Sequence, residues 1–137
     1  MKNKKTYMEM AVIWAQNSNA KRKKVGCLIV KDNRIISDGY NGTPTGLDNC
    51  CEEYCNEHIG LITKREVLHA ESNAITKLAA STMSSEGSSL FTTLSPCFDC
   101  AKLIIQSGIK EVYYLEEYDD PTAQELLKSI GIKFQQL

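Results

Sequence analysis

Apolar residues recur with helical spacing near the N-terminus and then in short continuous runs. Thr6 with Glu9 has the spacing of a capping box, and the apolar positions that follow predict a helix to about Asn17. The run "VGCLIV" (25–30) predicts a buried strand, and "RIISDGY" (34–40) predicts a second strand joined to it by the tight turn "KDN". The first part of the chain is therefore expected to form a helix followed by a β-hairpin.

Helical and strand patterns alternate in the second half of the chain. They predict a helix at 69–80, a strand at 88–94, a helix from Pro96 to Gly108, a strand at 111–115, a helix at 121–131 and a strand at 132–136. Residues 41–67 lack clear periodicity, and a loop of this length is usually functional or disordered. The order α-β-β-α-β-α-β-α-β predicts an α/β fold, a three-layer α-β-α sandwich with a central five-stranded mixed sheet, as a single domain over residues 1–137.

Composition excludes some classes of partner. The chain of 137 residues has a net charge of −1, whereas a protein that coats DNA or RNA normally has a basic excess, so we expect no nucleic-acid partner. The basic run "KRKK" (21–24) is the one local exception. With no signal peptide and no apolar run of membrane-spanning length, we expect a cytoplasmic protein with no membrane partner.

Two thiols three positions apart, Cys97 and Cys100 in "SPCFDC", are candidate metal ligands. Six cysteines in a cytosolic chain favour metal binding or packing over disulfides. His69 and Cys97 each begin a predicted helix, and helices entered from the same edge of a sheet bring their N-termini together. His69, Cys97 and Cys100 would then form a zinc site with three protein ligands and an open fourth position, as in catalytic zinc sites.

Glu71, two positions after His69, is the candidate catalytic residue, because a carboxylate beside such a zinc can accept a proton from water. Positions i and i+2 lie about 200° apart on a helix, so this arrangement requires the first turn. A zinc module that uses these ligands only for stability, and a thiol redox protein built on Cys97 and Cys100, remain open alternatives. The order H-x-E then P-C-x-x-C is more specific, because it is the signature of zinc-dependent base deaminases.

With these motifs the chain resembles the cytidine deaminase superfamily. Three segments carry the resemblance: "VGCLIVKDNRIISDGYNGTPTG", "LHAESNAI" and "LSPCFDCAKLIIQSGIKEVYYLEEYDD". Within the superfamily, "GYNGTP" and "CAKLIIQSGIKEVYY" are similar to the deoxycytidylate (dCMP) deaminase branch. The resemblance implies a cytidine deaminase-like fold and a hydrolase that removes ammonia from C4 of the cytosine ring, converting dCMP to dUMP for thymidylate synthesis. Glu71 would move the proton to N3 and then to the leaving amine.

The resemblance also implies a substrate pocket. By position, Asn41 is expected to hydrogen-bond the deoxyribose and the backbone N–H of Ala70 to bind the pyrimidine O2. The backbone carbonyl of Ser95 is expected to accept from the 4-amino group. Tyr118 is a candidate wall of the base pocket, although an ordinary half-buried tyrosine is an equal alternative.

Regulation is a further implication of the resemblance. Many enzymes of this branch are activated by dCTP and inhibited by dTTP, and many are homo-oligomers, such as hexamers or dimers. Arg22 and Lys24 would supply charge for an effector triphosphate and Mg²⁺ would accompany its phosphates, although a solvated loop is the alternative for these two residues. The expected effector site includes the "GYNG" residues Gly39, Tyr40, Asn41 and Gly42.

Some relatives hold a second, structural zinc in the insertion before "HAE". Here that insertion contains four possible ligands whose spacing does not match a familiar four-ligand pattern, so we expect a packed or partly exposed loop rather than a second zinc. They are Cys50, Cys51, Cys55 and His58. The substrate alternatives are dCTP, cytidine or deoxycytidine, guanine, or a tRNA base, and the modest charge disfavours tRNA.

Overall fold

A five-stranded sheet forms the centre of the protein. The computed structural model describes residues 1–54 and 60–137. The strands of this sheet lie in the order β2-β1-β5-β6-β7, with β1 antiparallel to β2 and β5, and β5, β6 and β7 mutually parallel. The predicted mixed sheet is therefore confirmed. The strand bounds are β1 Gly26–Lys31, β2 Arg34–Tyr40, β5 Ser89–Leu94, β6 Glu111–Glu116 and β7 Lys133–Gln136.

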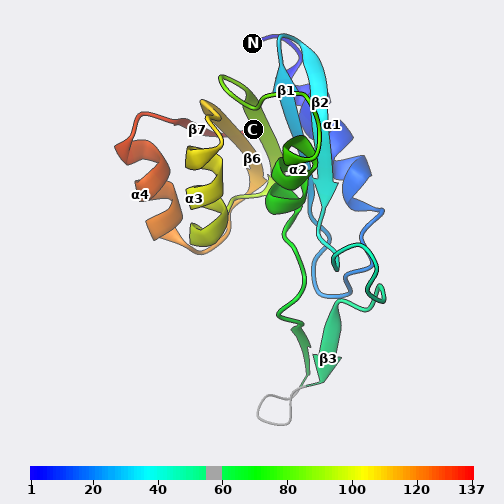
Figure 1. Cartoon of the computed structure of the whole chain (residues 1–137). Coiled ribbons are helices and arrows are strands. Elements are labelled where there is room, and N and C mark those ends of the chain that lie inside the picture. Colours follow the sequence, from blue (N-terminus) through cyan, green and yellow to red (C-terminus); the bar gives the residue numbers. More distant parts are fainter. Residues whose placement is uncertain (55–59) are drawn as a thin grey trace.

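Helices cover both faces of the sheet, which confirms the predicted three layers (Figure 1). On one face, Tyr7, Met8 and Ala11 of α1 (Lys4–Ala15) pack against Phe91 and Tyr113 of the sheet. The opposite face carries α2 (Ala70–Ala79), α3 (Phe98–Gln106) and α4 (Pro121–Ser129) over the larger apolar cluster. Since α2 and α3 lie on the same face, their N-termini can meet at one edge of the sheet.

The start of α1 differs from the sequence-based prediction. The helix begins at Lys4 rather than after Thr6, with Asn3 as its N-cap at a left-handed φ of 65°. The backbone N–H of Tyr7 donates to the carbonyl of Asn3 at 3.0 Å, so Thr6 lies inside the helix. The predicted capping box is therefore wrong. Asn3 is the N-cap instead, and its left-handed conformation, which asparagine tolerates, starts the helix about one turn earlier.

A second, two-stranded sheet lies within the segment that showed no periodicity. Strands β3 (Glu52–Tyr54) and β4 (Leu61–Thr63) pair antiparallel, with Glu52 opposite Thr63. The backbone N–H of Lys64 donates to the carbonyl of Cys51 at 2.8 Å and extends the pairing. Figure 1 shows this hairpin projecting away from the sandwich. The hairpin was not predicted, because each strand has only three residues and no alternation that sequence analysis can detect.

Across the part of the chain that the structure describes, the helices are all too short or too polar to cross a lipid bilayer.

Candidate catalytic metal centre

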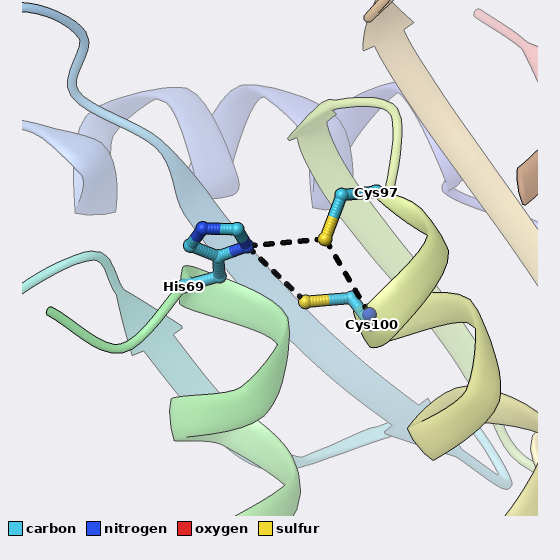
Figure 2. Close-up of side chains that lie close together, drawn as sticks. All are labelled: His69, Cys97 and Cys100. Atoms are coloured by element: carbon cyan, nitrogen blue, oxygen red, sulfur yellow. Dashed lines mark hydrogen bonds between the residues drawn. The ribbon is translucent and has the colours of Figure 1, made fainter. Parts of the chain in front are cut away.

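The N-termini of α2 and α3 bring together three candidate metal ligands. His69 is the N-cap of α2, Cys97 is the N-cap of α3, and Cys100 lies in the first turn of α3. Figure 2 shows the imidazole of His69 facing both sulfur atoms from across the gap between the helices. These residues are 28 and 31 positions apart in the chain. The shared helix-covered face of the sheet therefore assembles the site.

The distances within this group fit one metal ion. Nδ1 of His69 lies 3.3 Å from Sγ of Cys97 and 3.4 Å from Sγ of Cys100. A tetrahedral zinc at about 2.3 Å from a thiolate and about 2.0–2.1 Å from an imidazole nitrogen separates two such ligand atoms by about 3.6 Å. All three ligand atoms lie within 4.8 Å of one another, so small shifts accommodate the ion. The donor set, one imidazole and two thiols, is one that zinc prefers.

The local electrostatics favour a thiolate at this position. The pKa of Cys97 is lowered to about 4, first by the hydrogen bond from Cys100 and then, against the effect of burial, by His69. The pKa of Cys100 is raised, first by its side-chain hydrogen bond to Cys97, which keeps the proton on Cys100, and then by burial of the thiol. The hydrogen bond to Cys97 likewise raises the pKa of His69. The group therefore carries one thiolate, which favours the binding of a metal cation.

Glu71 lies in the first turn of α2, as its proposed chemistry requires. Its side chain is buried, with 3% of its surface exposed, and it lines the same cavity as His69 and Cys97. Burial raises its pKa, which the hydrogen bond from Thr92 partly offsets. Oγ1 of Thr92 donates to Oε1 of Glu71 at 2.5 Å. A carboxyl group with a raised pKa is suited to both accepting and returning a proton near neutral pH.

A cavity of about 330 Å³ opens over Glu71 and the metal ligands. Its volume suits a small molecule of nucleotide size. Each of the four residues that the resemblance implicated in substrate binding lines it: Asn41, Ala70, Ser95 and Tyr118. The cavity wall also contains residues that sequence analysis did not assign to substrate, namely Cys51, Thr63, Val67, Lys23 and Arg22.

Ser95 and Tyr118 are joined at one wall of this cavity. The hydroxyl of Ser95 accepts a hydrogen bond from the backbone N–H of Tyr118 at 2.6 Å, and its own N–H donates to the carbonyl of Glu116 at 2.8 Å. The side chain of Tyr118 is 46% exposed. Its position beside the cavity comes from this backbone bond, which fixes the loop after β6.

The residues expected to bind an effector do not all gather in one place. Tyr40 and Gly42 line a second cavity of about 300 Å³, whereas Arg22 lines the cavity of Glu71. Lys24 is exposed and lies outside both linings in the described part of the chain. Gly39 packs against α2, because a Cβ atom there would lie 2.3 Å from the carbonyl oxygen of Ala70.

The four possible ligands of a second zinc are only partly described. Cys50 is exposed and Cys51 is buried, with its side chain at the wall of the catalytic cavity. Cys55 and His58 lie outside the described residues. Within the described residues, the group of potential metal ligands is His69, Cys97 and Cys100.

Sequence reasoning missed Thr92 and the contribution of the β3–β4 hairpin to the cavity. Thr92 belongs to a buried strand. The sequence of such a strand is the same whether its threonine contacts a catalytic residue or only packs in the core. Lys23 was visible only as part of the basic run "KRKK". Its place at the cavity depends on contacts between segments that are distant in the chain.

This fold and this site define a class of protein. A family profile described as "Cytidine and deoxycytidylate deaminase zinc-binding region" matches residues 1–116. The chain belongs to this family. The predicted resemblance is therefore confirmed, as is the class of enzyme, a hydrolytic deaminase of a zinc-binding family.

Particular relatives lie in the deoxycytidylate branch. Deoxycytidylate deaminase of Enterobacteria phage T4 is 35% identical over 167 residues, covering 93% of this chain and 86% of the relative. The human deoxycytidylate deaminase is 38% identical over 136 residues, covering 93% of this chain and 75% of the relative. A crystal structure of dCMP deaminase from the cyanophage S-TIM5, in complex with dCMP and dUMP, superposes with a TM-score of 0.89 at 43% identity, covering 98% of this chain and 96% of that chain.

Proposed function

We propose that this protein catalyses the zinc-dependent hydrolytic deamination of dCMP to dUMP and ammonia. The observation that carries the proposal is the placement of buried Glu71 in the same cavity as His69 and Cys97, with Cys100 completing the ligand set. A zinc ion held by His69, Cys97 and Cys100 would supply Lewis-acid chemistry that lowers the pKa of water to about 7. The number of ligands leaves a fourth position open, which a purely structural site does not require.

Glu71 is the proposed proton carrier. In the net reaction a water oxygen bonds to C4 of cytosine and the bond from C4 to the amino nitrogen breaks. Glu71 accepts the proton of the attacking water and delivers it to N3, and it then carries the second proton to the departing amine, which leaves as ammonia. Its raised pKa, caused first by burial, suits both directions of transfer.

The other cavity residues are proposed to orient the base and sugar. The N–H of Ala70 would donate to the pyrimidine O2, and the carbonyl of Ser95 would accept from the 4-amino group. Asn41 would contact the deoxyribose, and Tyr118 would form a wall of the base site. All four line the cavity that contains Glu71, which supports these roles.

The choice of dCMP rests on the relatives. The phage T4 and human relatives are deoxycytidylate deaminases, and the cyanophage structure contains dCMP and dUMP. These similarities cover 93% and 98% of this chain. We further propose that residues 1–137 form one catalytic domain, that it acts in the cytoplasm, and that its product supplies dUMP for thymidylate synthesis.

Regulation and assembly are proposed on the family resemblance. We propose activation by dCTP with Mg²⁺, inhibition by dTTP, and a homo-oligomer, either a hexamer or a dimer. The effector would contact Lys24 and the segment Gly39 to Gly42, whereas Arg22, which we also expected to bind it, lines the cavity of Glu71 instead. Support for a nucleotide-sized effector site comes from the second cavity, which Tyr40 and Gly42 line.

One assay tests the proposed function. The purified protein should release ammonia from dCMP faster than from dCTP, deoxycytidine or cytidine, and added dCTP and dTTP should change the rate in opposite directions. Glu71→Ala should abolish turnover while about one zinc per chain remains bound, because Glu71 is not a ligand. Removal of the metal with a chelator should also abolish turnover, and zinc should restore it.

Three outcomes would contradict the proposal. Turnover of the nucleosides alone would exclude a nucleotide substrate. Zinc-loaded Glu71→Ala protein that retains activity would exclude the role of Glu71. Protein that is purified free of metal, with a disulfide between Cys97 and Cys100, would favour the redox alternative.

A further inference from the structure

The basic loop Lys21 to Lys24 has a backbone that is held by a buried carboxylate. Oε2 of Glu52 accepts hydrogen bonds from the backbone N–H of Lys21 at 2.7 Å and of Arg22 at 3.1 Å, and Oε1 accepts from Lys21 at 3.1 Å. Glu52 is 6% exposed and belongs to β3, about 30 positions further along the chain. Burying a carboxylate is unfavourable unless donors such as these satisfy it, so the contact is a built feature of the fold.

The other end of this loop is held by Asn41. Oδ1 of Asn41 accepts from the backbone N–H of Val25 at 2.9 Å, and Nδ2 donates to the carbonyl of Lys23 at 2.8 Å. The hydroxyl of Ser18 in turn donates to the carbonyl of Asn41 at 2.7 Å. Both ends of a short, highly charged loop are thus fixed by side chains from other segments, which is not how a freely solvated loop behaves.

The β3–β4 hairpin also contacts the side chain of Arg22. A terminal guanidinium nitrogen of Arg22 donates to Oγ1 of Thr63 at 3.3 Å, and Thr63 lies directly opposite Glu52 in the hairpin. The hairpin therefore holds Arg22 by its backbone and by its guanidinium group. Arg22, Lys23 and Thr63 line the cavity that contains His69 and Glu71, whereas Lys21 does not.

Lys23, the second cation that lines the cavity, has an acidic partner outside the lining residues. The ammonium group of Lys23 pairs with Glu116, at the end of β6, and both side chains are about half exposed. Exposed ion pairs of this kind contribute little to stability, and a doubly charged phosphate competes well for the lysine. The guanidinium of Arg22 can bind a phosphate through two parallel hydrogen bonds.

We propose that Glu52 is a positioning residue for phosphate recognition: it fixes the loop so that Arg22 and Lys23 bind the 5′-phosphate of a nucleoside monophosphate in the catalytic cavity. Glu52 does not line the cavity, and its two oxygens accept from the backbone N–H groups of Lys21 and Arg22. The inference rests on the proposed function and deepens it, since it assigns the preference for a nucleotide over a nucleoside to one hairpin.

The test compares substrates and ligands that differ only in the phosphate. For Arg22→Met and Glu52→Gln we expect the KM for dCMP to rise about tenfold or more with kcat changed less than about threefold, because the lost contacts are made equally in ground and transition states. Calorimetric titration should show weaker binding of dUMP by a similar factor and unchanged binding of deoxyuridine. Thr63→Val should have the same pattern at a smaller amplitude of about threefold, since one neutral contact is lost.

Lys21→Met is the matched control. It removes one positive charge from the same loop but keeps the backbone N–H that Glu52 binds, and its side chain does not line the cavity. We expect the Kd for dUMP to change by less than about twofold from the wild-type value. The remaining effect comes from the distant charge of Lys21, which salt screens. A loss equal to that of Arg22→Met would overturn the proposal in favour of a general effect of net charge.

Three further outcomes would also overturn it. Unchanged dUMP binding in Arg22→Met would exclude the proposed phosphate site. Unchanged dUMP binding in Glu52→Gln would exclude the positioning role of Glu52. Equal losses for dUMP and deoxyuridine in Thr63→Val and Glu52→Gln, with a lowered melting temperature, would make the hairpin merely structural. Failure of the proposed function is separate: wild-type protein without dCMP turnover would exclude that activity, while the dUMP and deoxyuridine titrations would still decide the phosphate site.

Discussion

At the scale of single residues, the hydroxyl of Thr92 lies between two acceptors but has one proton. Its Oγ1 lies 2.5 Å from Oε1 of Glu71 and 2.8 Å from the carbonyl of Leu94. When Glu71 is ionised, Thr92 can donate to it; when Glu71 is protonated, Thr92 can accept from it and donate to Leu94. Thr92 can therefore keep a hydrogen bond to Glu71 in both protonation states.

This arrangement predicts that Thr92→Val lowers kcat for dCMP by about tenfold while KM changes by less than about twofold. Valine preserves the shape of the side chain and removes the hydroxyl that orients Glu71. Steady-state kinetics and zinc content measure the effect together. Loss of zinc from the variant, or an equal change in KM, would show that Thr92 supports the fold of the site rather than the position of Glu71.

At the scale of elements, the close packing of β2 against α2 fixes the position of α2. His69 is the N-cap of this helix and Glu71 lies in its first turn. A Cβ atom at Gly39 would lie 2.3 Å from the carbonyl oxygen of Ala70 and 2.8 Å from the backbone nitrogen of Ala74. Asn73 of α2 also donates from Nδ2 to the carbonyl of Tyr40 at 2.7 Å. Strand and helix are therefore in backbone contact directly beside the metal centre.

We predict that Gly39→Ala reduces the free energy of unfolding by about 2 kcal/mol or more, because backbone atoms of α2 leave no room for a methyl group. Gly42→Ala is the matched control, since the nearest atom to its Cβ position is 4.0 Å away, and it should change stability by less than about 0.5 kcal/mol. Urea denaturation measures both. Equal stability of Gly39→Ala and wild type would mean that β2 and α2 separate easily.

The elements themselves were largely predictable, and the insertion was not. All nine predicted helices and strands are present within residues 1–54 and 60–137, because their apolar periodicity follows from burial on one face or both. The start of α1 was misplaced, since the helix is capped at Asn3, about one turn before the capping pattern of Thr6 and Glu9. The β3–β4 hairpin escaped detection, because its strands are stabilised by contacts such as Glu52 to the Lys21–Arg22 backbone rather than by a buried face.

At the scale of the whole molecule, an edge of the sheet remote from the metal centre contains a polar network. Glu111 accepts hydrogen bonds from Ser89 at 2.8 Å and from Tyr113 at 2.7 Å, and Lys133 of β7 lies 4.0 Å away. Burial works to raise the pKa of Glu111, but the hydrogen bonds from Tyr113 and Ser89 and the charge of Lys133 outweigh it and lower that pKa. The network joins β5, β6 and β7.

The sign of this shift predicts a pH dependence of stability. Because the pKa of Glu111 is lower in the folded state, its contribution is present above the ordinary value of 4.5 and is lost as the pH falls through the folded pKa. Glu111→Gln should therefore be less stable than wild type at pH 7, on the order of 1 kcal/mol, with the difference shrinking as the pH falls below 4.5. Urea denaturation across this range measures it, with Glu125→Gln on the exposed face of α4 as the control for net charge. A difference that stays constant as the pH falls would assign the effect to packing.

The sequence by itself indicated the candidate metal ligands His69, Cys97 and Cys100 and the candidate proton carrier Glu71, because all four occupy fixed places relative to two helix starts, and local rules govern helix starts. It also determined the order of layers through apolar periodicity. Only the tertiary structure decided what surrounds these groups: Thr92 on Glu71, and Glu52 and Thr63 on the loop that carries Arg22 and Lys23. Such contacts join residues 21 to 41 positions apart through individual hydrogen bonds, which leave no periodic trace in the chain, whereas burial of a helix face repeats every turn.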